Sequence, residues 1–224
     1  DPGEFIVGSF NEGLYRFVPG SKVFERIPEA RGWKRTQVFS MKADRRQGCV
    51  WIGTVRNGLF RYDIERDTFY HYVHDTRNPY ALAGDWVRDI TIDSSGYVWF
   101  ATDPVGLCRF DYHAHPDSAF ITITREHCLP SSFVAGLGTD PKGFLWMTTL
   151  DGMARIDPHY MSVIHFSKTD GLPSRRFNRA NLVMKPSGHV MVGTQTGYLH
   201  FNTSSLPHNP KPPGLIIRDL LVFD

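Results

Sequence analysis

The stretch Val98-Trp-Phe-Ala-Thr102, followed by Gly106-Leu-Cys-Arg-Phe-Asp111, decides the fold because it recurs along the chain. Similar pairs of short segments lie near residues 5–18, 50–63, 145–157 and 190–202. The glycine that opens the second segment of each pair stands at positions 13, 58, 106, 152 and 197, so successive copies are 45, 48, 46 and 45 residues apart. Repeats of about 40–50 residues made of short β segments are typical of propeller blades. We therefore expect an all-β chain of about five blades, each with four antiparallel strands.

Each repeat contains four short segments, of which the quoted pair forms the second and third. The first segment alternates apolar and polar residues, as in Val87-Arg-Asp-Ile-Thr-Ile-Asp93, which is the pattern of a half-buried strand. A tight turn that closes on glycine follows it, as in Asp93-Ser-Ser-Gly96. The fourth segment is an aromatic strand such as Thr68-Phe-Tyr-His-Tyr72. These four segments predict one blade per repeat.

The residues that recur most visibly are interpreted as architecture. One repeat position holds tryptophan in the three central copies, Trp51, Trp99 and Trp146. We expect these side chains between neighbouring sheets, where a tryptophan buries roughly 150–250 Å². The turn before them holds aspartate in the same three copies, Asp44, Asp93 and Asp140. Because they repeat, these aspartates indicate Asx-turn hydrogen bonding rather than catalysis or calcium binding.

The bulk composition limits the function classes. The chain has 224 residues, of which 41% are hydrophobic, enough for a packed core. Its 25 basic and 23 acidic residues give a net charge of +2, which is too balanced to favour nucleic-acid binding. No apolar run approaches the roughly 18 residues of a membrane span, and the first residues do not resemble a signal peptide. Membrane attachment is expected only through segments outside this sequence.

No metal site or cofactor is predicted. Cys49, Cys108 and Cys128 lack CxxC spacing and fall at unrelated repeat positions, so buried thiols are favoured over a zinc site or a disulfide framework, with one bridge left open. His113 and His115 form a possible pair of metal ligands without an apparent third. Phosphate-binding loops and nucleophile elbows are absent from the sequence, and no catalytic residue is predicted.

The repeat is incomplete at both ends. The chain enters at the second segment of one blade and leaves after the third segment of another, near Asn202. We expect residues 1–203 to be blades of a larger, seven-bladed propeller, with a closed five-bladed ring or two associated arcs as alternatives. Residues 204–214 contain four prolines and read as an extended linker. Residues 215–224, rich in Leu and Ile, are predicted to be the first strand of another domain.

Two motifs resemble a known family. Gly-x-Val-Trp-Phe/Ile-Gly/Ala-Thr-x-x-Gly-Leu-x-Arg-Phe/Tyr-Asp is similar to the two-component regulator propeller (Reg_prop) repeat. The stretch from Pro212 to Phe223 resembles the opening of the Ig-like Y_Y_Y domain that follows such repeats. The fifth copy departs from the pattern because Met191 replaces the tryptophan and His200-Phe-Asn202 replaces Arg-Phe-Asp. The five copies seen here are also fewer than the family's usual rings.

The resemblance implies an extracytoplasmic, periplasmic sensor region of an inner-membrane receptor. In that family a transmembrane helix and usually a histidine kinase follow, and the receptor is expected to be a homodimer. Many relatives detect oligosaccharides and regulate genes for glycan use. The sequence contains no kinase phosphoacceptor motif, so the type of output domain follows from the resemblance alone. This region itself is expected to be a non-catalytic sensor.

Ligand-binding residues are expected where the blades differ, at one end of the central channel. The entry to the first segment of each blade holds Gln37, Trp86, Phe133 and Asn178, which supply aromatic faces and amides suited to a carbohydrate. The alternative is that these side chains only plug the channel mouth. Two adjoining loops are basic and suggest an acidic glycan; they contain Arg31, Lys34 and Arg35, and Arg175, Arg176 and Arg179.

Two other classes of function stay open. A propeller-type polysaccharide lyase or glycosidase needs paired carboxylates or a Tyr or His base, and Glu126 with His127 is the suggestive neighbour pair. A non-catalytic scaffold for protein contacts is the third possibility.

Overall fold

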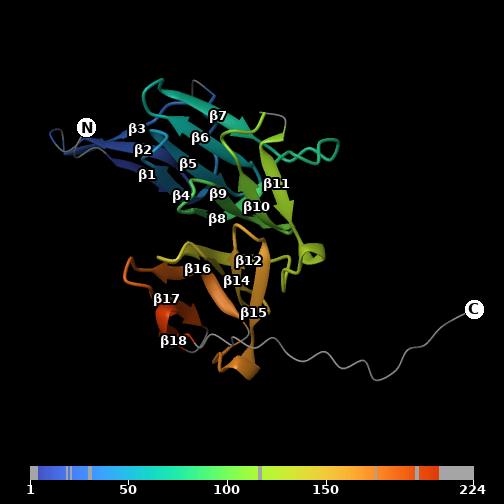
Figure 1. Ribbon diagram of the computed structural model, residues 1–224. Coiled ribbons are helices and arrows are strands. Elements are labelled where there is room, and N and C mark those ends of the chain that lie inside the picture. Colours follow the sequence, from blue (N-terminus) through green and yellow to red (C-terminus); the bar gives the residue numbers. More distant parts are fainter. Residues whose placement is uncertain are drawn as a thin grey trace, which may run out of the picture.

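The described residues fold into five antiparallel sheets that follow one another along the sequence (Figure 1). The computed structural model describes residues 5–206 except 19, 21, 30–31, 116–117, 175 and 195–196, with the backbone alone for 18 and 178–181. The first two sheets comprise β1 (Phe5–Ser9), β2 (Gly13–Val18) and β3 (Val23–Arg26), then β4 (Val38–Asp44), β5 (Cys49–Thr54), β6 (Leu59–Asp63) and β7 (Thr68–Tyr72). The third comprises β8 (Trp86–Ile92), β9 (Val98–Asp103), β10 (Gly106–Phe110) and β11 (Phe120–Ile123).

The last two sheets complete the described fold. They comprise β12 (Val134–Thr139), β13 (Leu145–Thr149), β14 (Gly152–Asp157) and β15 (Ser162–Phe166), then β16 (Phe177–Met184), β17 (His189–Thr194) and β18 (Gly197–Asn202). Three short 3-10 turns are η2 (Arg125–His127), η3 (Lys168–Asp170) and η4 (Thr203–Ser205). The prediction of all-β blades with four antiparallel strands is confirmed in the three central sheets.

The first strand of each blade lies at the inner edge. Strand β8 packs against β4 on one side and against β12 on the other, and β12 packs against β16. The fourth strands β7, β11 and β15 lie at the opposite edges of their sheets. Figure 1 shows the sheets succeeding one another from blue to orange in sequence order. The loops that enter the inner strands therefore gather at one end of the assembly.

The repeated tryptophans lie between sheets, as predicted. Trp51, Trp99 and Trp146 are 0%, 0% and 1% exposed. The Trp51 ring lies 5.3 Å from Phe100 and 5.0 Å from Phe110, both in the following sheet. Aromatic pairs at such distances add to the stabilisation from burial. Each tryptophan thus joins its own blade to the next one.

The side chains of the repeated aspartates accept hydrogen bonds from backbone N–H groups and, at Asp93 and Asp140, also from an indole N–H. Asp93 Oδ1 accepts the N–H groups of Ser95 and Tyr97, and Asp93 Oδ2 accepts the indole N–H of Trp99. Asp140 repeats this pattern in the fourth sheet. Asp44 also closes its turn, since its Oδ1 accepts the N–H of Arg46 at 3.1 Å. The expectation of Asx-turn hydrogen bonding is confirmed.

The described residues do not test the predictions about the linker, the following domain and the size of the ring. Turn η4 lies across the boundary between the predicted propeller and linker, and the rest of the linker and the strand at 215–224 lie outside the described residues. The seven-bladed ring stays a prediction. In the described part of the chain, no helix is long and apolar enough to cross a membrane. Within the same residues, no group of three or more His, Cys, Asp or Glu is placed to hold a metal ion.

Candidate ligand site

Three inner strands carry a β-bulge near their first residue. The pairing Val38–Thr54 in the second blade recurs as Val87–Thr102 in the third and as Val134–Thr149 in the fourth. Directly after each valine the register shifts by one residue, which leaves Phe39, Arg88 and Ala135 as the extra residues. A bulge takes one residue out of the ladder and re-aims its side chain. Each blade therefore presents one additional side chain at the inner edge.

The register corrects one predicted equivalence. Phe177 pairs with Thr194 in the fifth sheet, so it occupies the position of Val87 in the third. The residue equivalent to Trp86 is then Arg176, which precedes Phe177, and the alignment of Asn178 with Trp86 was wrong by two residues. The side chain of Asn178 lies outside the described residues.

Trp86 and Phe133 come together around a third residue, Arg88. The guanidinium carbon of Arg88 lies 4.2 Å from the Trp86 ring centroid and 4.4 Å from that of Phe133. A guanidinium stacks on aromatic faces through its planar, delocalised charge. Phe39 extends the aromatic group, since its ring lies 6.4 Å from Trp86 in an edge-on arrangement. The predicted aromatic positions are thus neighbours, but Arg88 occupies the space between them.

Arg88 is held by an ion pair inside the protein. Its Nη2 donates to Oδ2 of Asp103, which is the cross-strand partner of Trp86. The Arg88 side chain is 3% exposed and that of Asp103 is 18% exposed. The Arg88 Nε and Nη1 atoms and the Trp86 Nε1 atom are buried and have no hydrogen-bond partner among the described residues. Breaking a buried pair of this kind by removing one partner is strongly destabilising.

A pocket of about 450 Å³ opens in front of this cluster. It is lined by Trp86 and Asp103 together with Arg56, Asp85 and Pro104. The exposed Arg56 guanidinium carbon lies 6.0 Å from the Trp86 ring centroid. The pocket thus combines one aromatic face, two carboxylates and one accessible guanidinium, a set that binds a polar ligand with an apolar face.

The loop that carries Arg56 is held beside the inner strands by backbone hydrogen bonds. The Val55 N–H donates to the Gln37 carbonyl at 3.0 Å, and the Gly58 N–H donates to the Asp85 carbonyl at 2.8 Å. Asp85 also accepts the His74 N–H on its Oδ1. Gln37 therefore adjoins the loop of Arg56, while its own side chain is exposed and does not line the pocket.

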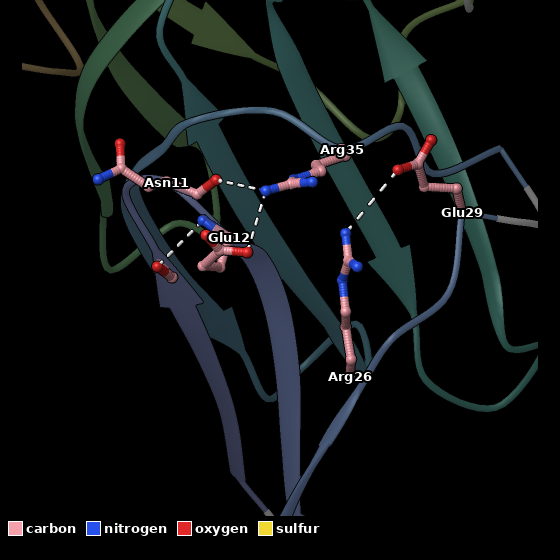
Figure 2. A network of polar contacts seen from close by, with 6 residues as sticks. Asn11, Glu12, Arg26, Glu29 and Arg35 are labelled. Carbon is pink, nitrogen blue, oxygen red and sulfur yellow. Dashed lines mark hydrogen bonds and ion pairs between the residues drawn. The ribbon is translucent and has the colours of Figure 1, made fainter.

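Arg35 is engaged elsewhere at this end of the fold. Figure 2 shows its Nη2 donating to the Asn11 carbonyl at 3.3 Å and to Glu12 Oε2 at 3.0 Å. In the same view Arg26 reaches Glu29 at 3.9 Å. Arg35 thus ties its loop to the β1–β2 hairpin, and Glu12 balances its charge.

The remaining predicted basic residues are only partly described. Arg176 is exposed, and its N–H donates to Ser174 Oγ at 3.1 Å. Lys34 is exposed as well. Arg31, Arg175 and the side chain of Arg179 lie outside the described residues. The convergence of the two basic loops therefore stays a prediction.

The suggestive pair Glu126 and His127 belongs to the 3-10 turn η2. His127 Nδ1 accepts the N–H of Thr124 at 3.2 Å, and Thr124 Oγ1 accepts the N–H of Glu126 at 3.3 Å. In this reciprocal capping arrangement the His127 side chain is engaged in closing the turn, while Glu126 contributes its backbone N–H.

Four residues that line the pocket were not predicted, namely Arg56, Asp85, Asp103 and Pro104, and neither was Arg88 behind it. A signal for Asp103 was available, because the residue after the repeated threonine is Val55, Asp103 or Leu150 in the central copies. Arg88 differs likewise from Phe39 and Ala135 at the bulge. Both positions vary between repeats in which the preceding threonine or valine is constant.

The chain is similar to a histidine kinase and to an extracellular domain of a two-component system, although no family model matches it. It is 19% identical over 218 residues to Histidine kinase P4 of Formosa agariphila, a match that covers 77% of this chain and 16% of that protein. The extracellular domain of a hybrid two-component system from B. thetaiotaomicron superimposes with a TM-score of 0.73 at 22% identity, over 91% of this chain and 27% of that one.

A further solved structure supports the fold. The WD40 β-propeller domain of Doa1 aligns with a TM-score of 0.60 at 13% identity, over 89% of this chain and 60% of that domain. The fold is therefore that of propeller blades. The chain spans about a sixth of the kinase and about a quarter of the extracellular domain that it matches.

Proposed function

We propose that this chain is part of the extracytoplasmic, periplasmic sensor region of a two-component receptor in the inner membrane. The similarity to Histidine kinase P4 and to an extracellular two-component domain supports this role. On this proposal, kinase activity belongs to another part of the receptor, and the blades described here carry a ligand site without catalysis. The ligand proposed is an oligosaccharide that leads to regulation of transcription.

The pocket beside Trp86 is the observation that carries the proposal. It lies at the end of the inner strands where loops of the second and third blades meet, and its lining differs from repeat to repeat. Sugars present C–H groups to aromatic faces and hydroxyls to carboxylates and guanidinium groups. Trp86, Asp103 and Arg56 supply these three elements around one space.

A bound ligand can signal only if it binds one conformation of the receptor more tightly than another. The buried Arg88–Asp103 pair connects β8 to β9, and the Arg88–Phe133 stack connects β8 to the entry of β12. A ligand that contacts Trp86 and Asp103 thus acts on groups shared by two blades. We propose that this change reaches a homodimer through the segments that follow the propeller.

A panel of oligosaccharides tests the function. Melting temperature and product formation are followed together for each sugar, and a bound ligand raises the melting temperature by mass action. We expect a melting shift without turnover. Turnover would instead support a lyase or glycosidase, and the absence of both would support a scaffold.

Two variants link the response to the pocket. Trp86→Ala removes the aromatic face, so the melting shift is expected to disappear. Tyr160→Ala is the matched control, because Tyr160 is an aromatic residue with 77% exposure that does not line the pocket. A shift that survives in Trp86→Ala would place the ligand elsewhere.

A further inference from the structure

The proposed function leaves the charge of the ligand open, and the lining of the pocket bears on it. Resting on that function, we infer that the pocket binds an uncharged sugar unit whose hydroxyls donate to Asp85 and Asp103, and that Arg88 is the positioning residue that holds Asp103 and Trp86 in place.

The charges around the pocket are the first step. Asp85 and Asp103 both line it, and Arg56 is the exposed cation in that lining. Arg88 is nearly inaccessible, and its Nη2 is already bonded to Asp103. A ligand carboxylate would therefore meet two carboxylates of the same sign and one exposed guanidinium, because the charge of Arg88 is buried and already paired with Asp103. Like charges at close range repel, so an acidic sugar is disfavoured here.

Hydrogen-bond chemistry is the second step. An ionised carboxylate only accepts hydrogen bonds and a guanidinium only donates them. A sugar hydroxyl does both, so it can donate to Asp85 or Asp103 and accept from Arg56. A carboxylate ligand satisfies Arg56 alone. The donor and acceptor set of the lining thus fits hydroxyls better than an anionic group.

The packing of Arg88 is the third step. Its guanidinium lies between Trp86 at 4.2 Å and Phe133 at 4.4 Å while it binds Asp103. This arrangement covers one face of the indole and fixes one carboxylate oxygen, so the ligand meets an aromatic face and an acceptor in a set orientation. Such preorganisation lowers the cost of binding. Arg88 itself, at 3% exposure, acts through these two residues.

Calorimetry with matched sugars tests the ligand class. Each uncharged oligosaccharide is paired with a uronate counterpart of the same length and linkage, and both are titrated into this chain at about 50 and about 300 mM NaCl. The uncharged member is expected to bind about tenfold more tightly, with an affinity that salt leaves nearly unchanged. Tighter binding of the uronate would overturn the inference while the sensor function stands. Binding of neither member would overturn both.

A double-mutant cycle tests the positioning role. Arg88→Gln and Asp103→Asn are each expected to weaken binding of the uncharged sugar by about tenfold. Because Arg88 acts through Asp103 as well as through Trp86, Arg88→Gln is expected to weaken binding less in the Asp103→Asn background than in the wild type, so the double variant loses less than the product of the two single losses. It also carries no unpaired buried charge, so it remains folded where a single variant fails. Equal losses from Arg88→Gln in both backgrounds would contradict the role. Arg66→Gln, which loses surface contacts with Asp63 and Tyr70 away from this pocket, serves as the control.

Discussion

The indole N–H of Trp99 donates to Oδ2 of Asp93, six residues earlier, at 2.7 Å. The same relationship joins Trp146 to Asp140 at 2.9 Å. In the second blade a tyrosine from the next blade intervenes, because Tyr112 accepts the Trp51 N–H at 2.8 Å and donates to Asp44 at 2.9 Å. The turn and the inter-sheet core are therefore one hydrogen-bonded unit in each central repeat.

Replacement of Asp140 should destabilise the fold more than replacement of an ordinary turn aspartate. Asp140→Ala leaves the N–H groups of Lys142, Phe144 and Trp146 without their acceptor, so we expect a loss of about 3 kcal/mol. Asp157→Ala is the control, since Asp157 accepts from His159 and Tyr160 near the surface. Urea unfolding monitored by circular dichroism measures both. Similar losses in the two variants would show that the indole contact contributes little.

Alanine substitutions at Gly152 and Gly171 distinguish the cost of backbone strain from the cost of steric overlap. Their φ angles are +93° and +92°, so alanine is strained at both positions by about 1–2 kcal/mol. A Cβ at Gly152 would also collide with the Phe166 carbonyl oxygen, whereas a Cβ at Gly171 meets nothing within 4 Å. We expect Gly152→Ala to lower the free energy of unfolding clearly more than Gly171→Ala in the same urea assay. Equal effects would mean that the hairpin shifts to accommodate the methyl group.

The three thiols should differ in reactivity. Cys49 and Cys108 are buried and Cys128 is exposed. The thiolate is the reactive form, and burial raises the pKa of the Cys108 thiol to about 12. At about pH 8 an aromatic disulfide reagent should therefore label Cys128 quickly and the other two only on unfolding. Rapid labelling of two or three thiols in the folded chain would contradict this.

Cys108 should also make stability fall at alkaline pH. The folded-state pKa lies above the ordinary value of 9.0, so the neutral thiol stabilises the fold fully below pH 9. As pH rises toward about 12 the unfolded chain ionises first, and this residue's contribution falls by about 1.4 kcal/mol per pH unit. The difference between wild type and Cys108→Ala, measured by urea unfolding at rising pH, isolates the effect. Parallel pH profiles for the two proteins would exclude it.

We expect the fifth blade to tolerate the tyrosine–arginine pair that the third blade holds at the same two repeat positions. Arg109 lies 4.3 Å from the Tyr97 ring, while the equivalent positions hold His189 and His200, whose Nδ1 and Nε2 are 3.0 Å apart. His189→Tyr with His200→Arg restores the cation–π pair and should stabilise the fold by about 0.5–1 kcal/mol beyond the sum of the single changes. A double-mutant cycle in urea measures this coupling. A coupling energy of zero would show that these two positions of the fifth blade do not bring the side chains together as they do in the third blade.

Constant positions were predictable from the sequence because their contacts are local or identical from blade to blade. The period alone indicated the sheets, and its repetition assigned Trp99 and Asp93 to architecture. The contacts of Arg88 were not predictable, because they join β8 to the entry of β12, which lies more than forty residues further along the chain. Local alternation of apolar and polar residues carries no information about such a stack.

The offset in the fifth blade has a related cause. Between Phe177 and Leu182 the inner strand of the fifth blade exceeds its partner strand by two more residues than the bulges of the central blades do, so counting from the turn does not locate the start of the strand. Only the pairing of Phe177 with Thr194 identifies Arg176 as the equivalent of Trp86. Ladder register, rather than spacing along the sequence, defines equivalent positions between blades.

The bulges at Phe39, Arg88 and Ala135 bear on how propeller blades diversify. Each of these residues stands outside the ladder hydrogen bonds that hold its sheet together. Substitution at a bulge position leaves the pairing of the flanking valine and threonine in place. One position per central blade can thereby change without loss of ladder hydrogen bonds, and where its side chain is buried and paired, as at Arg88, the partner Asp103 has to change with it.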